Sequence, residues 1–212
     1  MRMQAYVPFV RDKSAVSALP PGGTVHQRPA RKAEGALELF YVGGVGGEHY
    51  DIAPMLRAVE ALDGVYLTLC CRQAEWDKVK TQFQQLRNVN VVHDSGEQLK
   101  QYYRNADAFL MWRGMTEYLQ FAVAVKFQEA LGWGLPVITN SHCEMGDLVK
   151  NESLGWTPDT EQDLVTLLKR LVANPKEVVE KSASVAARRE QHSWRARAQT
   201  VLSIMDQHRS AQ

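Results

Sequence analysis

Short apolar runs alternate with amphipathic segments along most of this chain. Between the runs, apolar side chains recur every three to four positions, which is the spacing of a helix with one buried face. Strands that are apolar on both faces and alternate with helices are typical of a parallel sheet covered on both sides. The pattern predicts an α/β fold with a doubly wound, Rossmann-like parallel sheet. The expected strands cover 37–42, 65–71, 89–93, 107–112 and 136–139, with a short sixth strand near Trp156.

The expected helices carry start and stop signals in the sequence. Asp51 and Thr160 are predicted N-caps, and Ser95 with Gln98 is a predicted capping box. Gly134 is predicted to end one helix, and Asn174-Pro175 is predicted to end another. The expected helices cover 51–62, 74–86, 95–103, 122–134 and 160–173, and one or two more are expected up to about 208.

Three segments are expected along the 212 residues. Residues 1–36 are rich in proline, glycine and charge, so we interpret them as a linker or the remnant of a preceding domain. Residues 37–191 are predicted to form the ligand-binding domain, and 192–212 a C-terminal helix and tail. The domain is long enough to bury a substantial core.

The charge balance and the cysteines exclude several classes of function. The chain has 25 basic and 24 acidic side chains, so no nucleic-acid partner is expected. A basic stretch at 186–199 is either a solvated helix face or a patch for anionic lipid or a partner. Cys70, Cys71 and Cys143 suggest neither a disulfide framework nor a zinc site, and they fit a reducing, cytoplasmic compartment. The sequence contains no signal peptide and no transmembrane run.

Ligands of doubly wound sheets bind outside the carboxyl ends of the strands. The loop GGVGG at 43–47 follows the first strand and is either a plain turn or a loop that lets its backbone approach a phosphate. His49 replaces the third glycine of a dinucleotide fingerprint, and no acidic residue ends the second strand, so a nicotinamide cofactor is not expected. The candidate ligand-facing residues at the strand ends are Gly43, Gly44, Arg72, His93, Ser95, Arg113 and His142.

Lys126 and Glu129 lie three positions apart and therefore share a helix face. They form either a surface ion pair or part of a ligand site. Their neighbours are almost all apolar, and burying unpaired charge is costly, which favours a functional pair. Glu129 suits ribose hydroxyls and Lys126 suits a diphosphate, while Arg72 and Arg113 are either further phosphate ligands or ordinary surface arginines. Tyr118 is expected in the core or stacked on a base, and no residue is assigned as catalytic.

From about Leu37 to Met205, the chain resembles the C-terminal, donor-binding domain of GT-B glycosyltransferases of the retaining family 4. The similar stretches are LFYVGGVGGEHYDI, LKQYYRNADAFLMW, VKFQEALGWGLPVI and HSWRARAQTVLSIM. The resemblance implies one half of a GT-B fold, a UDP- or GDP-linked sugar donor, transfer with retention, and no metal or other cofactor. It implies that Glu129 binds the donor ribose. The second glutamate of the family, eight positions earlier, is replaced by Phe121, and Lys126 is then expected to serve the phosphates.

GT-B enzymes have two such domains, so the resemblance implies that an N-terminal acceptor-binding domain, or self-association, completes the enzyme. We expect a glycan or lipid-linked acceptor in polysaccharide biosynthesis, in the cytoplasm and at the inner face of the membrane. The alternative is a non-catalytic nucleotide-sugar-binding subunit or fragment that needs a partner domain. A sugar-nucleotide epimerase is a third hypothesis, with His93, His142 and Glu144 as its acid/base candidates.

Overall fold

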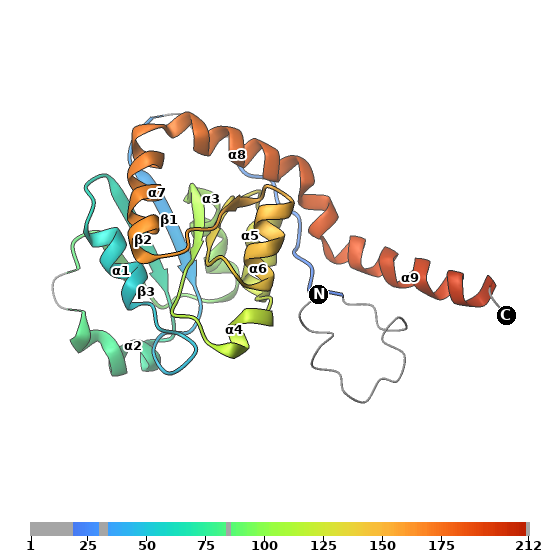
Figure 1. Ribbon diagram of the computed structural model, residues 1–212, viewed down its shortest axis with the longest axis horizontal. Helices are drawn as coiled ribbons and strands as arrows, with labels where there is room; N and C mark the ends of the chain where they lie inside the picture. Colours follow the sequence, from blue (N-terminus) through green and yellow to red (C-terminus); the bar gives the residue numbers. More distant parts are fainter. Residues whose placement is uncertain (1–18, 30–33, 84–85, 211–212) are drawn as a thin grey trace.

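Figure 1 shows the computed structural model, in which helices cover both sides of a central sheet. The structure describes residues 19–29, 34–83 and 86–210. The first half of the predicted linker, residues 1–18, lies outside the described residues.

The sheet has six parallel strands in the order β3-β2-β1-β4-β5-β6. Because the strand order reverses between β1 and β4, the sheet is doubly wound, with its topological switch point between these two strands. This confirms the predicted fold class, including the short sixth strand. The strands are β1 (Leu37–Val42), β2 (Val65–Cys70), β3 (Val89–Val92), β4 (Ala108–Met111), β5 (Val137–Thr139) and β6 (Gly155–Trp156).

Each strand as far as β6 is separated from the next by helix, with two helices between β4 and β5, and the remaining helices follow one another after β6. The described residues also form the short 3-10 turns η3 (Lys80–Gln82), η4 (Gly96–Gln98) and η5 (Arg189–His192). The helices are α1 (Ala53–Glu60), α2 (Gln73–Val79), α3 (Leu99–Asn105), α4 (Glu117–Phe121), α5 (Val125–Gly132), α6 (Glu144–Asn151), α7 (Glu161–Ala173), α8 (Pro175–Arg188) and α9 (Trp194–Ser210).

The two faces of the sheet bury two separate hydrophobic clusters. Along β1, Leu39 and Tyr41 face the cluster formed with α1 and α7, whereas Phe40 and Val42 face the cluster formed with α3, α5 and α6. This alternation follows from the two-residue period of a strand. Cys70 and Cys71 belong to opposite clusters for the same reason.

Two of the predicted helix caps differ from the structure. Thr160 forms a capping box with Asp163, which confirms the predicted start of α7. In contrast, Ile52 is the N-cap of α1, and Asp51 accepts a hydrogen bond from the Ala53 amide at 3.0 Å. The capping box predicted at Ser95 is wrong, because its side chain makes no capping hydrogen bond and a 3-10 turn precedes α3.

Two predicted helices are shorter than expected. The helix predicted over 122–134 begins only at Val125, because residues 122–124 are extended between α4 and α5. It ends before Gly134, which has φ +70, as predicted. The helix predicted over 74–86 ends at Val79, and η3 then turns the chain so that Phe83 stacks on Trp76 at 5.8 Å between ring centroids.

The segment 19–29 has no helix of its own and lies against the domain. Gly23 forms an isolated bridge with Ser193, and the His26 amide donates to the Gly132 carbonyl at 3.0 Å. Arg28 donates to Ser182 Oγ at 2.6 Å and to the Ala106 carbonyl. At the other end of the chain, α9 extends away from the sheet and its helices (Figure 1). Among the described residues, none of the helices combines the length and apolar composition that a membrane-spanning helix needs.

Candidate functional site

A cleft of about 630 Å³ lies at the carboxyl ends of β1, β2 and β3. It borders the switch point between β1 and β4, where ligands of doubly wound sheets bind. The loop after β1, the start of α2, the loop after β3 and the start of α5 each supply part of its wall. The lining residues are Val42, Gly43, Gly44, Tyr50, Cys70, Cys71, Arg72, Gln73, Glu75, His93, Asp94, Ser95, Gly96, Leu99 and Lys126.

The glycine loop after β1 is held close to its neighbours. Tyr41 donates its hydroxyl hydrogen to the Gly44 carbonyl at 2.6 Å, and a Cβ added at Gly44 would lie 3.0 Å from the Tyr50 ring. A side chain at this position would therefore push into the cleft wall. Because α1 begins only at Ala53, the loop does not lead directly into a helix N-terminus. Any contact with a phosphate would come from the loop amides themselves.

Lys126 and Glu129 meet on α5, as their spacing predicts. The Lys126 ammonium lies 2.9 and 3.1 Å from the two carboxylate oxygens of Glu129, and the side chains are 36% and 32% exposed. Tyr103, on α3, donates its hydroxyl hydrogen to Glu129 Oε2 at 2.9 Å. The pair is thus neither fully solvated nor buried, and Lys126 reaches the cleft wall while Glu129 is anchored behind it.

Three other predicted residues line the cleft. Arg72 is 86% exposed and pairs with Glu75 at 2.9 Å, so its guanidinium is held only on one side and can reorient toward a ligand. The His93 Nδ1 lies 2.9 Å from the Cys71 carbonyl, and Ser95 precedes η4. Of the three acid/base candidates, His93 lines the cleft, whereas His142 and Glu144 do not.

The structure places four predicted donor-binding residues away from the cleft lining: Glu129, which lies behind Lys126, and Arg113, His142 and Tyr118. Arg113 is 6% exposed, and its guanidinium carbon lies 5.4 Å from the centre of the Tyr50 ring. It therefore lies behind Tyr50, which lines the cleft. The exposed His142 ring lies 3.5 Å from Asp159, and Tyr118 packs beside His49 at 5.1 Å between ring centroids. A role of Arg113, His142 or Tyr118 in donor binding stays a prediction.

No pattern in the sequence identified Tyr50 and Gln73 as residues of the cleft lining. Tyr50 and Gln73 lie beyond the strand ends, so the rule for strand ends does not single them out. Asp94 accepts a hydrogen bond from the Tyr102 hydroxyl, and this contact, with partial burial, raises the pKa of Tyr102 to about 12. Among the described residues, no group of three or more histidines, cysteines or carboxylates is placed to hold a metal.

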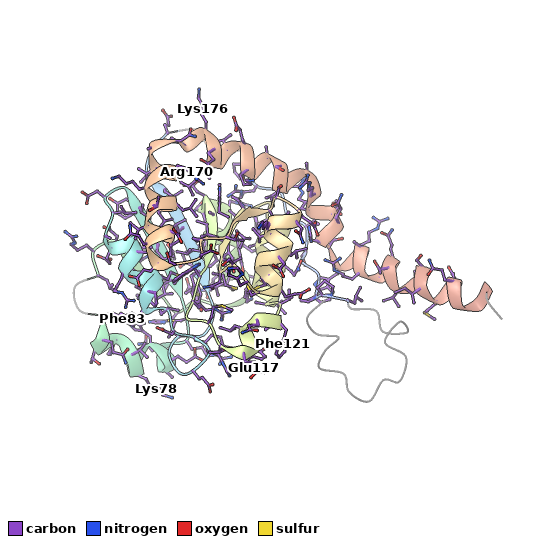
Figure 2. The ribbon with its side chains drawn as sticks, viewed as in Figure 1. Lys78, Phe83, Glu117, Phe121, Arg170 and Lys176 are labelled. Atoms are coloured by element: carbon purple, nitrogen blue, oxygen red, sulfur yellow. The ribbon has the colours of Figure 1, made fainter. Side chains whose placement is uncertain are left out.

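Phe121 occupies the position at which the family resemblance expects a second glutamate. It lies at the end of α4, and Figure 2 labels it together with Glu117 at the lower edge of the molecule. Its ring meets Tyr118 edge-on at 5.6 Å between centroids. An apolar ring cannot accept hydrogen bonds from sugar hydroxyls as a carboxylate does, so this position offers a donor sugar no acidic contact.

Comparisons with known proteins agree on one type of protein. A family model described as glycosyl transferase-like matches residues 52–203, while no curated protein matches the chain. Sucrose-phosphate synthase from Thermosynechococcus elongatus has a similar structure, with a TM-score of 0.72 and 19% identity over 100% of this chain and 57% of that one. HepE of Anabaena, solved with UDP and glucose, gives a TM-score of 0.65 and 15% identity over 82% and 49%.

A third solved structure is WaaG, a glycosyltransferase involved in lipopolysaccharide biosynthesis, with a TM-score of 0.62 and 16% identity over 84% of this chain and 54% of that one. The chain thus spans about half the length of each of these proteins. At such low identities the structures establish the fold alone, whereas the family model covers most of the chain. The chain belongs to the glycosyl transferase-like family and has the fold of one half of a GT-B glycosyltransferase.

Proposed function

We propose that this chain binds a UDP- or GDP-linked sugar in the cleft and acts as the donor half of a retaining glycosyltransferase. The acceptor in this proposal is a glycan or a lipid-linked sugar. The observation that carries the proposal is the Lys126–Glu129 pair beside the cleft at the switch point of the sheet. A cation and a carboxylate at that place match the diphosphate and the ribose of a nucleotide sugar.

Glu129, beside the cleft, and four residues of the cleft lining have chemical tasks in this proposal. Glu129 accepts hydrogen bonds from ribose hydroxyls, and Lys126 pairs with the diphosphate. Arg72 is held on one side only and can swing to the diphosphate, while Gly43 and Gly44 let the backbone approach it. As the bond between sugar and diphosphate breaks, negative charge grows on the leaving diphosphate, and these cations stabilise it.

A partner domain or a second copy of the chain is part of the proposal. The exposed apolar side chains of α9 are Trp194, Val201, Leu202 and Met205. Their spacing of seven, eight and eleven positions from Trp194 places them on one face of the helix. In the proposal, an acceptor-binding domain packs on this face of α9 and is thereby held close to the domain that contains the cleft. The proposed location is the cytoplasm at the inner membrane surface, because the spacing of the three cysteines in the sequence suggests no disulfide framework and fits a reducing compartment.

A second candidate function is a nucleotide-sugar-binding subunit without catalytic activity. Phe121 favours it, because the donor sugar would lose a carboxylate contact that the family resemblance expects. Such a subunit would still bind the nucleotide through Glu129. It would, however, transfer no sugar even after its partner is added.

Isothermal titration calorimetry with UDP, GDP, ADP and their sugars tests the proposal. Glu129→Ala should weaken binding of nucleosides and nucleotides alike, whereas Lys126→Ala should weaken only the diphosphates, each by about tenfold because one hydrogen bond to a charged group is lost. Lys80→Ala is the matched control, since Lys80 also pairs with a carboxylate three positions away but does not line the cleft. Folded protein that gives no binding heat with any of these ligands would refute the proposal.

A further inference from the structure

The Glu129 carboxylate accepts hydrogen bonds from two side chains, Lys126 and Tyr103. Lys126 contacts both of its oxygens, and the Tyr103 hydroxyl donates to Oε2 at 2.9 Å. A carboxylate offers about four acceptor sites, so these contacts leave it about one. A ribose presents two hydroxyls. Lys126 must therefore turn away before Glu129 can accept hydrogen bonds from both hydroxyls.

A bound diphosphate gives Lys126 a reason to turn. The ammonium lines the cleft, where phosphate oxygens would compete with Glu129 for its three hydrogens. Once Lys126 has moved to the phosphates, Tyr103 is the remaining protein contact of Glu129 among those the structure shows. The orientation of the carboxylate then depends on whether the Tyr103 hydroxyl stays in place.

The ring of Tyr103 has little freedom to move. Its side chain is 2% exposed and stacks on Trp133, with an interplanar angle of 5° and 6.0 Å between ring centroids. Phe40 meets it edge-on at 4.9 Å, at an angle of 87°. Burial and the Glu129 carboxylate both raise the pKa of Tyr103, so the hydroxyl keeps its proton and remains a donor. Tyr103 is thus a fixed donor on a different helix from Glu129.

The segment 19–29 contributes another ring that stacks on Trp133. The His26 ring lies on Trp133 with 4.1 Å between ring centroids and an interplanar angle of 13°. His26, Trp133 and Tyr103 therefore form a row of three stacked rings, which ends at the Glu129 carboxylate. The row connects a segment outside the sheet to the carboxylate proposed to bind ribose.

We propose that Tyr103 is a positioning residue, which holds Glu129 in the orientation that accepts both ribose hydroxyls while Lys126 is engaged with the diphosphate. Trp133, backed by His26, keeps Tyr103 in place. This proposal rests on the proposed function, because it assigns a role within the same nucleotide site. A merely structural hydrogen bond, which only satisfies a buried hydroxyl, would not distinguish nucleotides with ribose hydroxyls from those without.

The test uses the full chain and pairs of nucleotides that differ only at the ribose. Calorimetry measures the dissociation constants of UDP, GDP and ADP and of their 2′,3′-dideoxy analogues. Tyr103→Phe removes the hydroxyl and keeps the ring, and Tyr66→Phe, at an exposed tyrosine on β2, is the matched control. Glu129→Ala and the double variant complete a double-mutant cycle, and circular dichroism confirms that each variant is folded.

Tyr103→Phe should weaken the ribonucleotide by about tenfold, as expected for a lost hydrogen bond to a charged group. The same change should leave the dideoxy analogue within about twofold, and it should add nothing in the Glu129→Ala background. Equal losses for both analogues, or additive losses in the double variant, would overturn the proposal. If Tyr103→Phe does not fold, Trp133→Phe replaces it, with a smaller loss that is again confined to the ribonucleotide.

The outcomes separate this proposal from the proposed function. Absence of binding to the unmodified chain overturns both. Binding that does not change in Glu129→Ala overturns the ribose contact of Glu129, and the role of Tyr103 with it. Binding that depends on Glu129 but not on Tyr103 overturns only the positioning role and leaves the nucleotide site intact.

Discussion

Substituting Gly132 with alanine should have two opposite effects on stability, one from helix propensity and one from a tertiary contact. Gly132 is the last residue of α5, and alanine is favoured over glycine within a helix by about 1 kcal/mol. However, an added Cβ would lie 2.2 Å from the carbonyl oxygen of Thr24. A backbone oxygen cannot rotate away as a side chain can. The segment 19–29 must therefore shift for the alanine to fit.

The size of the effect follows from what that shift breaks. The hydrogen bond from the His26 amide to the Gly132 carbonyl, at 3.0 Å, contributes about 1 kcal/mol. The His26–Trp133 stack contributes about 0.5–1.5 kcal/mol. The Arg28–Ser182 hydrogen bond, at 2.6 Å, contributes about 1 kcal/mol more. After the helix gain is subtracted, Gly132→Ala should destabilise the chain by about 1.5–2.5 kcal/mol, which lowers the melting temperature by about 3–10 °C.

Differential scanning calorimetry and urea unfolding measure this difference. A chain lacking residues 1–29 is the decisive comparison, because it has no Thr24 and retains both core clusters, whose residues begin at Leu37. In that shortened chain Gly132→Ala should stabilise by about 1 kcal/mol. A higher melting temperature in the full chain, or the same decrease in both chains, would refute the reasoning.

Three further predictions concern a cap, a buried histidine and a buried thiol. Thr160→Ala removes the capping box of α7 and should lower the free energy of unfolding by about 1 kcal/mol in urea titrations. Burial lowers the pKa of His192 below its ordinary 6.5, and Glu152 offsets only part of this. Below pH 6.5 the unfolded chain therefore binds a proton at His192 that the folded chain excludes. The free energy of unfolding should be highest above pH 6.5 and should decrease as the pH falls below it. His192→Gln should make the free energy of unfolding less dependent on pH, as measured by urea titrations at several pH values. Burial raises the pKa of Cys71 to about 12, so iodoacetamide at pH 8 should label it only after unfolding, as followed by mass spectrometry.

The strands could be predicted because their signal is local and repeated. Apolar runs such as 108–111 are buried at every position, which is typical of a strand covered on both faces. The break at 122–124 could not be predicted, because alanine and valine carry no stop signal and the extended backbone there depends on how α4 and α5 pack. The packing of 19–29 escaped for a related reason. Its contacts use glycine backbone, as at Gly23, which has no place in a hydrophobic pattern.

Some features of the candidate site could be predicted from the sequence, and others could not. Lys126 and Glu129 could be paired from the sequence because three positions along a helix fix their distance. Tyr103 could be assigned to the core by its helical spacing, yet its hydroxyl contact with Glu129 depends on how α3 lies beside α5. Arg113 was expected either at the ligand or as an ordinary surface arginine, and the structure buries it: the Asn140 side chain bonds its backbone N–H and its carbonyl, and its guanidinium lies over the Tyr50 ring. Contacts between separate loops leave no periodic trace.

The short helix α5 joins the two parts of the molecule that these experiments perturb. Lys126 in its first turn lines the cleft, and its last residue, Gly132, is in close contact with the segment 19–29. Displacing that segment removes His26 from Trp133, so it should also loosen Tyr103 and with it Glu129. Gly132→Ala should therefore weaken ribonucleotides more than their dideoxy analogues, although no altered atom touches the ligand. If the substitution leaves the ratio of ribonucleotide affinity to dideoxynucleotide affinity unchanged, the stacked rings stabilise the fold without positioning the site.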